Sequence, residues 1–152
     1  MPPPVPVASQ LDAIVDDYRD HGNVGLLIDR VRALADASDI PPLKSAAAQY
    51  DAMPEVTIPV FEAIVRRSPE DAQALVVLGN AYWLTGRGPA AVAALADKAR
   101  GVDPGNRGAW HLWALAEPDP RGRMGRWALV AEQFPADKLA RAALADGAAG
   151  IA

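Results

Sequence analysis

Apolar side chains recur at helical spacing in short segments along the whole chain. Within each segment they lie at offsets 0, 3, 4 and 7, which places them on one face of a helix. The pattern is clearest in three segments, which carry Leu11, Ile14, Val15 and Tyr18; Leu43, Ala46, Ala47 and Tyr50; and Leu75, Leu78, Gly79 and Tyr82. The sequence has no alternating Val-, Ile- and Thr-rich runs of the kind that predict strands. The pattern therefore predicts an all-α fold of about nine helices.

Prolines and glycines interrupt this pattern and divide the helices into antiparallel pairs. In the stretch Gly86-Arg87-Gly88-Pro89, a glycine ends one helix and a proline suits the first turn of the next. Pro69, Pro104 and Pro135 each close a pair. The intervals between them, 35 and 31 residues, lie on either side of about 34 residues, a period typical of helical-hairpin repeats. Pro59 is expected in the first turn of its own helix. The sequence therefore predicts repeated helical hairpins.

These boundaries predict four regions. Residues 1–8 are rich in proline and are expected to be a disordered lead. Residues 9–38 form an N-terminal helix pair, with Ser9 able to cap its first helix, and this pair is a divergent repeat or a cap. Residues 39–135 contain three helix pairs, and residues 136–149 form a C-terminal capping helix.

The middle pair resembles the tetratricopeptide repeat, whose signature contains W-x2-L-G-x2-Y and a closing proline. The matching residues are Leu75 (where tryptophan is usual), Leu78, Gly79, Tyr82 and Pro104. In the following pair, Trp110 occupies the position that the family gives to tryptophan. The resemblance implies a right-handed α-α superhelix of stacked antiparallel helix pairs. It also implies a non-enzymatic scaffold or adaptor that binds a peptide or protein segment in a concave groove.

The resemblance indicates which residues would line that groove, because the first helix of each pair faces the concave side. The candidate groove residues are Lys44, Gln73, Val76, Asn80, Trp83 and His111. Asn80 falls where many members carry an asparagine that hydrogen-bonds a peptide backbone. Structural roles stay open: Asn80 as a solvated residue, Trp83 as packing under the loop, and His111 as a structural histidine. Trp110, Trp113 and Trp127 are expected in the core, since they lie on the packing stripes.

Composition and charge exclude several classes of function. The formal net charge of −4 disfavours a general role in nucleic-acid binding, which needs a basic face. The basic cluster of Arg121, Arg123 and Arg126 beside Trp127 keeps nucleic-acid binding as a minor alternative. The chain has no cysteine and two distant histidines, so we expect no metal site and no cofactor. No phosphate-binding or nucleophile motif occurs, and we expect no catalytic residues.

Two further expectations concern location and assembly. No apolar run reaches the roughly 18 residues that a membrane span requires, and the first residues lack the features of a signal peptide. We therefore expect a cytoplasmic protein. Self-association is a structural alternative to the adaptor, in which Leu11, Ile14 and Tyr18 of the N-terminal pair would be shared between chains.

Overall fold

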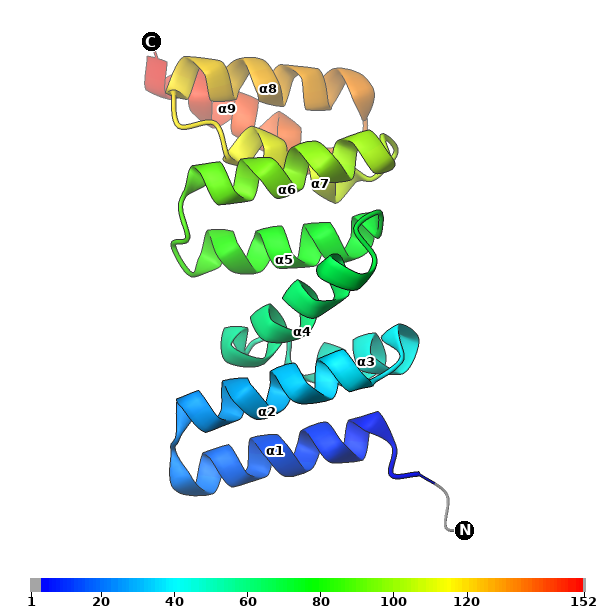
Figure 1. Cartoon of the computed structure of the whole chain (residues 1–152). Coiled ribbons are helices and arrows are strands. Elements are labelled where there is room, and N and C mark those ends of the chain that lie inside the picture. Colours follow the sequence, from blue (N-terminus) through cyan, green and yellow to red (C-terminus); the bar gives the residue numbers. More distant parts are fainter. Residues whose placement is uncertain (1–3, 152) are drawn as a thin grey trace. The chain divides into compact units, whose positions relative to one another are not determined.

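A computed structural model describes the chain from residue 4 to residue 151, with side-chain surroundings described up to residue 146. This part of the chain consists of nine α-helices and one short 3-10 helix, with no strand (Figure 1), and the all-α prediction is confirmed. The helices are α1 (Val7–His21), α2 (Val24–Ala37), α3 (Ile40–Ala47), η1 (Ala48–Tyr50), α4 (Pro54–Arg67), α5 (Ala72–Leu84), α6 (Pro89–Val102), α7 (Arg107–Leu115), α8 (Pro120–Gln133) and α9 (Lys138–Ile151).

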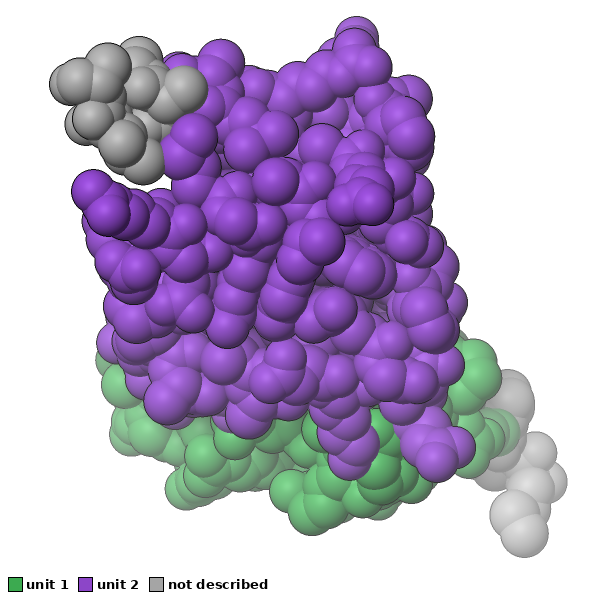
Figure 2. All heavy atoms as spheres, turned by 90° about the horizontal axis from the view of Figure 1, so that it is seen from above, with its two compact units in different colours: residues 1–69 green, residues 70–152 purple. Residues whose placement is uncertain are grey.

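The chain divides into two compact units, which Figure 2 colours green and purple. Unit 1 is Met1–Pro69 and contains α1 to α4. Unit 2 is Glu70–Ala152 and contains α5 to α9. The division comes directly after Pro69, where the second predicted helix pair of the chain ends, and each unit is described below by itself. The right-handed superhelix stays a prediction.

Local capping signals explain where most helices begin. Five helices start with a side chain that accepts a hydrogen bond from a backbone N–H of the first turn, and these caps are Asn23, Asp71, Asn106, Asp119 and Asp137. Proline occupies the first turn of α3, α4, α6 and α8, where its missing N–H has no partner to lose. Between α5 and α6, Gly86 and Gly88 have φ values of 71° and 97°, which glycine adopts without strain. The predicted turn is therefore present.

Two helix starts differ from the sequence prediction. Helix α1 begins at Val7, so Ser9 lies inside the helix and is not its cap. Residues 7 and 8 are accordingly helical, and residues 1–3 of the predicted lead lie outside the described part of the chain. Pro6 precedes the helix, and its carbonyl accepts a hydrogen bond from the Gln10 N–H at 3.1 Å. Helix α4 begins at Pro54, which places Pro59 in the second turn rather than the first.

In unit 1 the helix contacts form a closed ring. Helix α1 packs against α2 and α3, and α4 packs against the same two helices from the other side of the ring. The interior is filled by fully buried aliphatic side chains, among them Leu11, Val15, Val31 and Leu43. Polar contacts hold the ring together, because the Tyr50 hydroxyl donates to the Asp12 carboxylate and ties η1 to α1.

In unit 2 the helices pack mainly in series. Each helix from α5 to α9 contacts the next, and α5 also contacts α7. The α5–α7 approach depends on Gly79, since a Cβ at this position would lie 2.7 Å from Cδ1 of Leu112. Glycine at position 79 therefore permits Leu112 of α7 to lie close to the backbone of α5. Along the described residues, no helix combines the length and the apolar composition that crossing a membrane would require.

Candidate binding groove

A groove with a volume of about 580 Å³ lies within unit 2. We call it the unit 2 groove. Its lining comes from one residue each of α5 and α7, from the first half of α8 and from α9: Trp83, Leu115, Pro120, Arg123, Met124, Trp127, Leu139, Ala142, Ala143 and Asp146. All but two of these residues are apolar. The volume falls within the range of about 300–1,000 Å³ that is typical of ligand sites.

Two of the lining side chains leave much apolar surface in contact with water. Trp83, at the end of α5, is 41% exposed, and Leu139, at the start of α9, is 50% exposed. The end of α5 is fixed by Thr85, whose Oγ1 donates a hydrogen bond to the Ala81 carbonyl at 2.7 Å. An exposed indole on a helix end held in this way can add a large contact area at a small cost in conformational entropy.

The position of α9 depends on a buried carboxylate, Asp137, whose side chain is 2% exposed. Its oxygens accept hydrogen bonds from the Ala140 N–H at 3.0 Å and from Nε2 of His111 at 2.6 Å. The Arg107 guanidinium lies 3.5 Å away. Burial alone would raise the pKa of Asp137, but the Ala140 N–H, His111 and Arg107 together hold this pKa below its usual value. The cluster therefore ties the start of α9 to α7.

A second cluster stacks arginines on aromatic rings between α6, α7 and α8. The Arg100 guanidinium lies 4.2 Å from the ring centre of Trp110 and 3.8 Å from that of Trp113. Arg126 stacks on Trp113 at 4.8 Å. Burial, with a smaller contribution from Arg126, lowers the pKa of Arg100 despite the opposing effect of Asp97. Trp110 and Trp113 are thus half-buried packing residues, whereas Trp127 is fully buried as expected.

The three arginines of the predicted basic cluster have different surroundings. Arg126 is occupied, because it pairs with Glu117 at 3.0 Å and donates to the Trp113 carbonyl at 2.7 Å. Arg121 is exposed and lies outside the groove lining. Arg123 is half-buried in the groove, and no side-chain hydrogen bond or ion pair is found for it among the described residues. The cluster therefore does not form one continuous basic surface.

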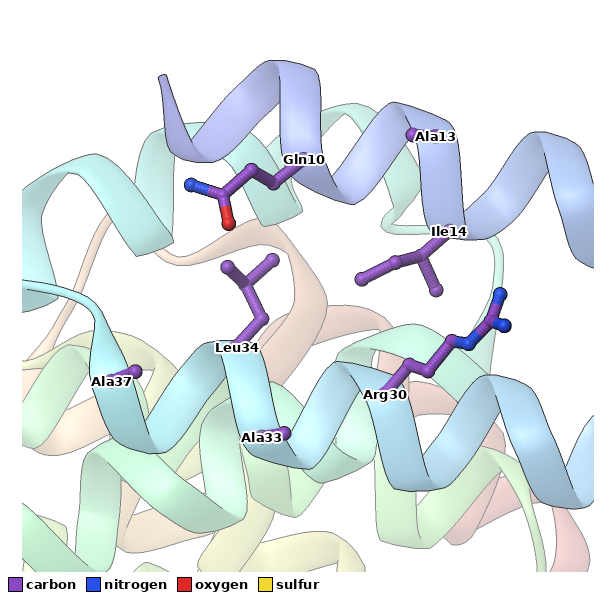
Figure 3. Close-up of a pocket in the computed structure, with 7 residues that line it drawn as sticks. All are labelled: Gln10, Ala13, Ile14, Arg30, Ala33, Leu34 and Ala37. Carbon is purple, nitrogen blue, oxygen red and sulfur yellow. The ribbon is translucent and has the colours of Figure 1, made fainter. Parts of the chain in front are cut away.

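Unit 1 has a shallower hollow of about 470 Å³ between α1 and α2, which we call the unit 1 notch (Figure 3). Ile14 and Leu34 point into it, and alanines of both helices widen it. Its polar groups already have partners, since Arg30 pairs with Asp17 at 2.9 Å and Gln10 donates to the Val5 carbonyl. The notch therefore lacks a polar group that would select a ligand, unlike the unit 2 groove.

Of the predicted groove residues that belong to unit 2, only Trp83 lines the unit 2 groove. Gln73 and Asn80 are exposed on α5 outside its lining. Val76 is half-buried and packs so closely on α7 that a Cβ on Gly108 would lie 2.9 Å from its Cγ1. His111 is half-buried, bonded to Asp137 and 5.6 Å from the Trp127 ring centre. Lys44 lies half-buried on α3 in unit 1.

Several lining residues could not be identified from the sequence, because an apolar stripe on a helix predicts packing against a neighbour. Leu139, Ala142 and Ala143 lie on the apolar stripe of α9, and all three line the groove. Asp137, although it is charged, is buried as the residue that caps α9. Its position directly before the helical pattern was a signal for a cap, but nothing local indicated its bond to His111.

Among the described residues, no group of three or more His, Cys, Asp or Glu side chains is placed to hold a metal ion. The chain matches no protein-family model, and no curated protein is significantly similar to it. The interpretation of the groove therefore depends on its geometry and chemistry.

Proposed function

We propose that this chain is a non-enzymatic scaffold that binds a peptide segment of a partner protein in the unit 2 groove. One observation carries the proposal: an exposed indole, Trp83, and an exposed leucine, Leu139, border an apolar groove of about 580 Å³. Apolar patches that remain exposed in this way favour interaction with a partner, and tryptophan is enriched among residues that contribute most to binding. The resemblance to the tetratricopeptide repeat is compatible with this role.

The surroundings of the groove support a preformed site. Two walls come from helices whose ends are fixed by specific bonds, at Thr85 for α5 and at Asp137 for α9. A site that is already ordered loses little conformational entropy when a ligand binds. Val76 and His111 are engaged within unit 2, so the proposed contact surface centres on Trp83 rather than on the full predicted set.

The test compares Trp83→Ala with Leu129→Ala in the whole 152-residue chain. Leu129 is also an exposed apolar residue, at 49%, but it lies on α8 outside the groove lining. Affinity capture from the native lysate, followed by mass spectrometry, should recover the same partner with the wild type and Leu129→Ala and lose it with Trp83→Ala. Circular-dichroism melts of all three proteins should agree closely. A partner retained by Trp83→Ala would contradict the proposal.

Self-association is less well supported. Leu11 is fully buried, so it is not available to a second chain while unit 1 is folded. Ile14 lines the unit 1 notch and could still contact another molecule. Light scattering across a concentration series, with Ile14→Ala as the variant, tests this alternative.

A further inference from the structure

The lining of the unit 2 groove is largely apolar but includes one cationic side chain, and this cation has no acidic partner in the part of the chain that the structure describes. Arg123 is half-buried on α8, and the described residues provide neither an ion pair nor a side-chain hydrogen bond for its guanidinium. The neighbouring Arg126 differs, because it is held by Glu117 and the Trp113 carbonyl. Arg123 is thus the charged group of this helix that remains available inside the groove.

Two carboxylates near Arg123 do not neutralise it. Asp119 caps α8 and accepts a hydrogen bond from the Gly122 N–H at 3.0 Å. Asp146 is the acidic residue of the lining, but it is exposed to solvent and forms no ion pair with Arg123 in the described structure. A ligand that covers the apolar lining would remove water from Arg123. A cation that loses its water without gaining an anion makes binding costly, so a ligand with a matching carboxylate is favoured.

We infer that the unit 2 groove selects a peptide segment in which an acidic side chain lies among bulky apolar residues, with the acid bound by Arg123. The apolar side chains cover Trp83, Met124 and Leu139, and the carboxylate accepts charge-assisted hydrogen bonds from the guanidinium. The inference rests on the proposed function and adds the chemistry of the partner. Apolar contact supplies most of the affinity, and Arg123 supplies the specificity.

The experiment is a selection of phage-displayed random dodecapeptides on the whole chain, carried out in parallel on wild type, Arg123→Glu, Arg121→Glu and Trp83→Ala. Peptides from the wild type should share Asp or Glu next to bulky apolar residues. Arg123→Glu should replace that acid with Lys or Arg at the same position. Arg121→Glu is the matched control, because Arg121 lies on the same helix outside the lining, and it should retain the acidic consensus.

Fluorescence polarisation with one selected peptide then measures the interaction between Arg123 and the acidic side chain of that peptide. Arg123→Gln should weaken binding of the acidic peptide about tenfold, as expected for loss of one charge-assisted hydrogen bond. It should not change binding of the same peptide with its acid replaced by the corresponding amide. A double-mutant cycle of this kind separates the pairwise interaction from general effects on the groove.

The possible outcomes separate the two proposals. Peptides that depend on Trp83 but carry no acid, or whose acid does not respond to Arg123→Glu, overturn the inference and leave the peptide-binding proposal intact. A selection in which no enriched peptide depends on Trp83 overturns both. A dimer in sedimentation experiments that Trp83→Ala abolishes would assign the groove to a second copy of this chain and overturn the inference. Binding of a fluorescent oligonucleotide that is lost in Arg123→Glu would assign Arg123 to nucleic-acid binding and would also overturn the inference.

Discussion

The two units are built from similar helices but connect them differently. In unit 1 the contacts of α1 to α4 close into a ring, whereas α5 to α9 of unit 2 pack mainly one after another. Every helix of the ring packs on two others, whereas α9, at the end of the series, packs mainly on α8. Unit 1 also exposes apolar side chains such as Leu26, but Trp83 and Leu139, which border the larger groove, belong to the serial unit. The comparison suggests that the binding surface arises where packing is left open.

The units also differ in how a polar contact secures a helix. In unit 1 the Tyr50 hydroxyl donates to Asp12 at the half-buried edge of α1. In unit 2 the fully buried Asp137 ties α9 to α7 through His111. Because α9 packs mainly on α8, the bond between Asp137 and His111 is a specific polar link between the start of α9 and α7.

The largest effect is expected for core substitutions, which test whether unit 1 unfolds cooperatively and unit 2 does not. Leu43 and Leu112 are matched core residues, 0% and 1% exposed. Replacing either with alanine should cost about 3 kcal/mol through lost burial and a residual cavity. In Leu43→Ala, hydrogen exchange should increase in α1 to α4 together. In Leu112→Ala it should increase mainly in α5 to α7, and less in α9.

The control for this pair is tryptophan fluorescence, because all four tryptophans lie in unit 2. During unfolding by denaturant, tryptophan emission should therefore follow unit 2 alone, and its midpoint should shift to lower denaturant in Leu112→Ala. If Leu112→Ala loosens α5 to α9 equally, unit 2 is as cooperative as unit 1 and the distinction between ring and series is lost.

The next effect concerns Asp137. An asparagine still caps α9 but loses the charged bonds to His111 and Arg107, so Asp137→Asn should cost about 2 kcal/mol at neutral pH. The loss should appear as faster hydrogen exchange in α9 first. Asp119→Asn is the matched control, since it changes a capping carboxylate that is exposed at the start of α8. A loss spread equally over α5 to α9 would contradict a local role.

The same variant has a defined pH dependence. The pKa of Asp137 is lowered in the folded protein, so its ionised form stabilises the fold fully above about pH 4, the usual pKa of an unfolded aspartate. This contribution is lost as the pH falls through the folded pKa. Thermal melts should therefore show the wild type approaching Asp137→Asn in stability below about pH 4. A constant difference between them down to low pH would mean that the charge of Asp137 is not the cause.

The fold was largely predictable because its signals are local. The caps Asn23 and Asp71 and the turn at Gly86 and Gly88 mark helix ends within a few residues, and Gly79 marks a close approach. The ring in unit 1 was not predictable, since the contact of α2 with α4 joins segments that no local signal relates.

The groove was predictable only in part. Val76 and Trp83 lie on one stripe of α5, two turns apart, and were expected to face the same ligand. The structure covers Val76 with the backbone of α7 at Gly108 and leaves Trp83 open. Whether a helical position is covered depends on where its neighbour approaches, which a periodic pattern does not contain.

A smaller effect tests the polar contact of the ring. Tyr50→Phe removes the hydroxyl that bonds to Asp12 and should cost about 1 kcal/mol, expressed as faster exchange in α1. Burial, reinforced by the bond to Asp12 and by its charge, raises the pKa of Tyr50 to about 12. The stability that this bond contributes is present below about pH 10 and is lost as the pH rises through the folded pKa. The tyrosinate absorbance of Tyr50, obtained as the difference between the wild type and Tyr50→Phe, should therefore appear with a midpoint near pH 12. A midpoint near pH 10, the usual pKa of tyrosine, would contradict the raised pKa.

The smallest expected effect is Gly79→Ala, which sets two opposing terms against each other. Alanine has a higher helix propensity than glycine, which favours the helix by about 1 kcal/mol. Its Cβ, however, would lie 2.7 Å from Cδ1 of Leu112, and overpacking of this kind typically destabilises a protein by about 1–3 kcal/mol. In the wild type the two terms should nearly cancel or slightly destabilise unit 2. In the Leu112→Ala background the clash is gone, so Gly79→Ala should stabilise by about 1 kcal/mol. Urea titrations of the four proteins, followed by tryptophan fluorescence, complete the double-mutant cycle. Equal effects of Gly79→Ala in both backgrounds would show that the approach of α7 to α5 does not depend on this glycine, and the close packing of the series would need another explanation.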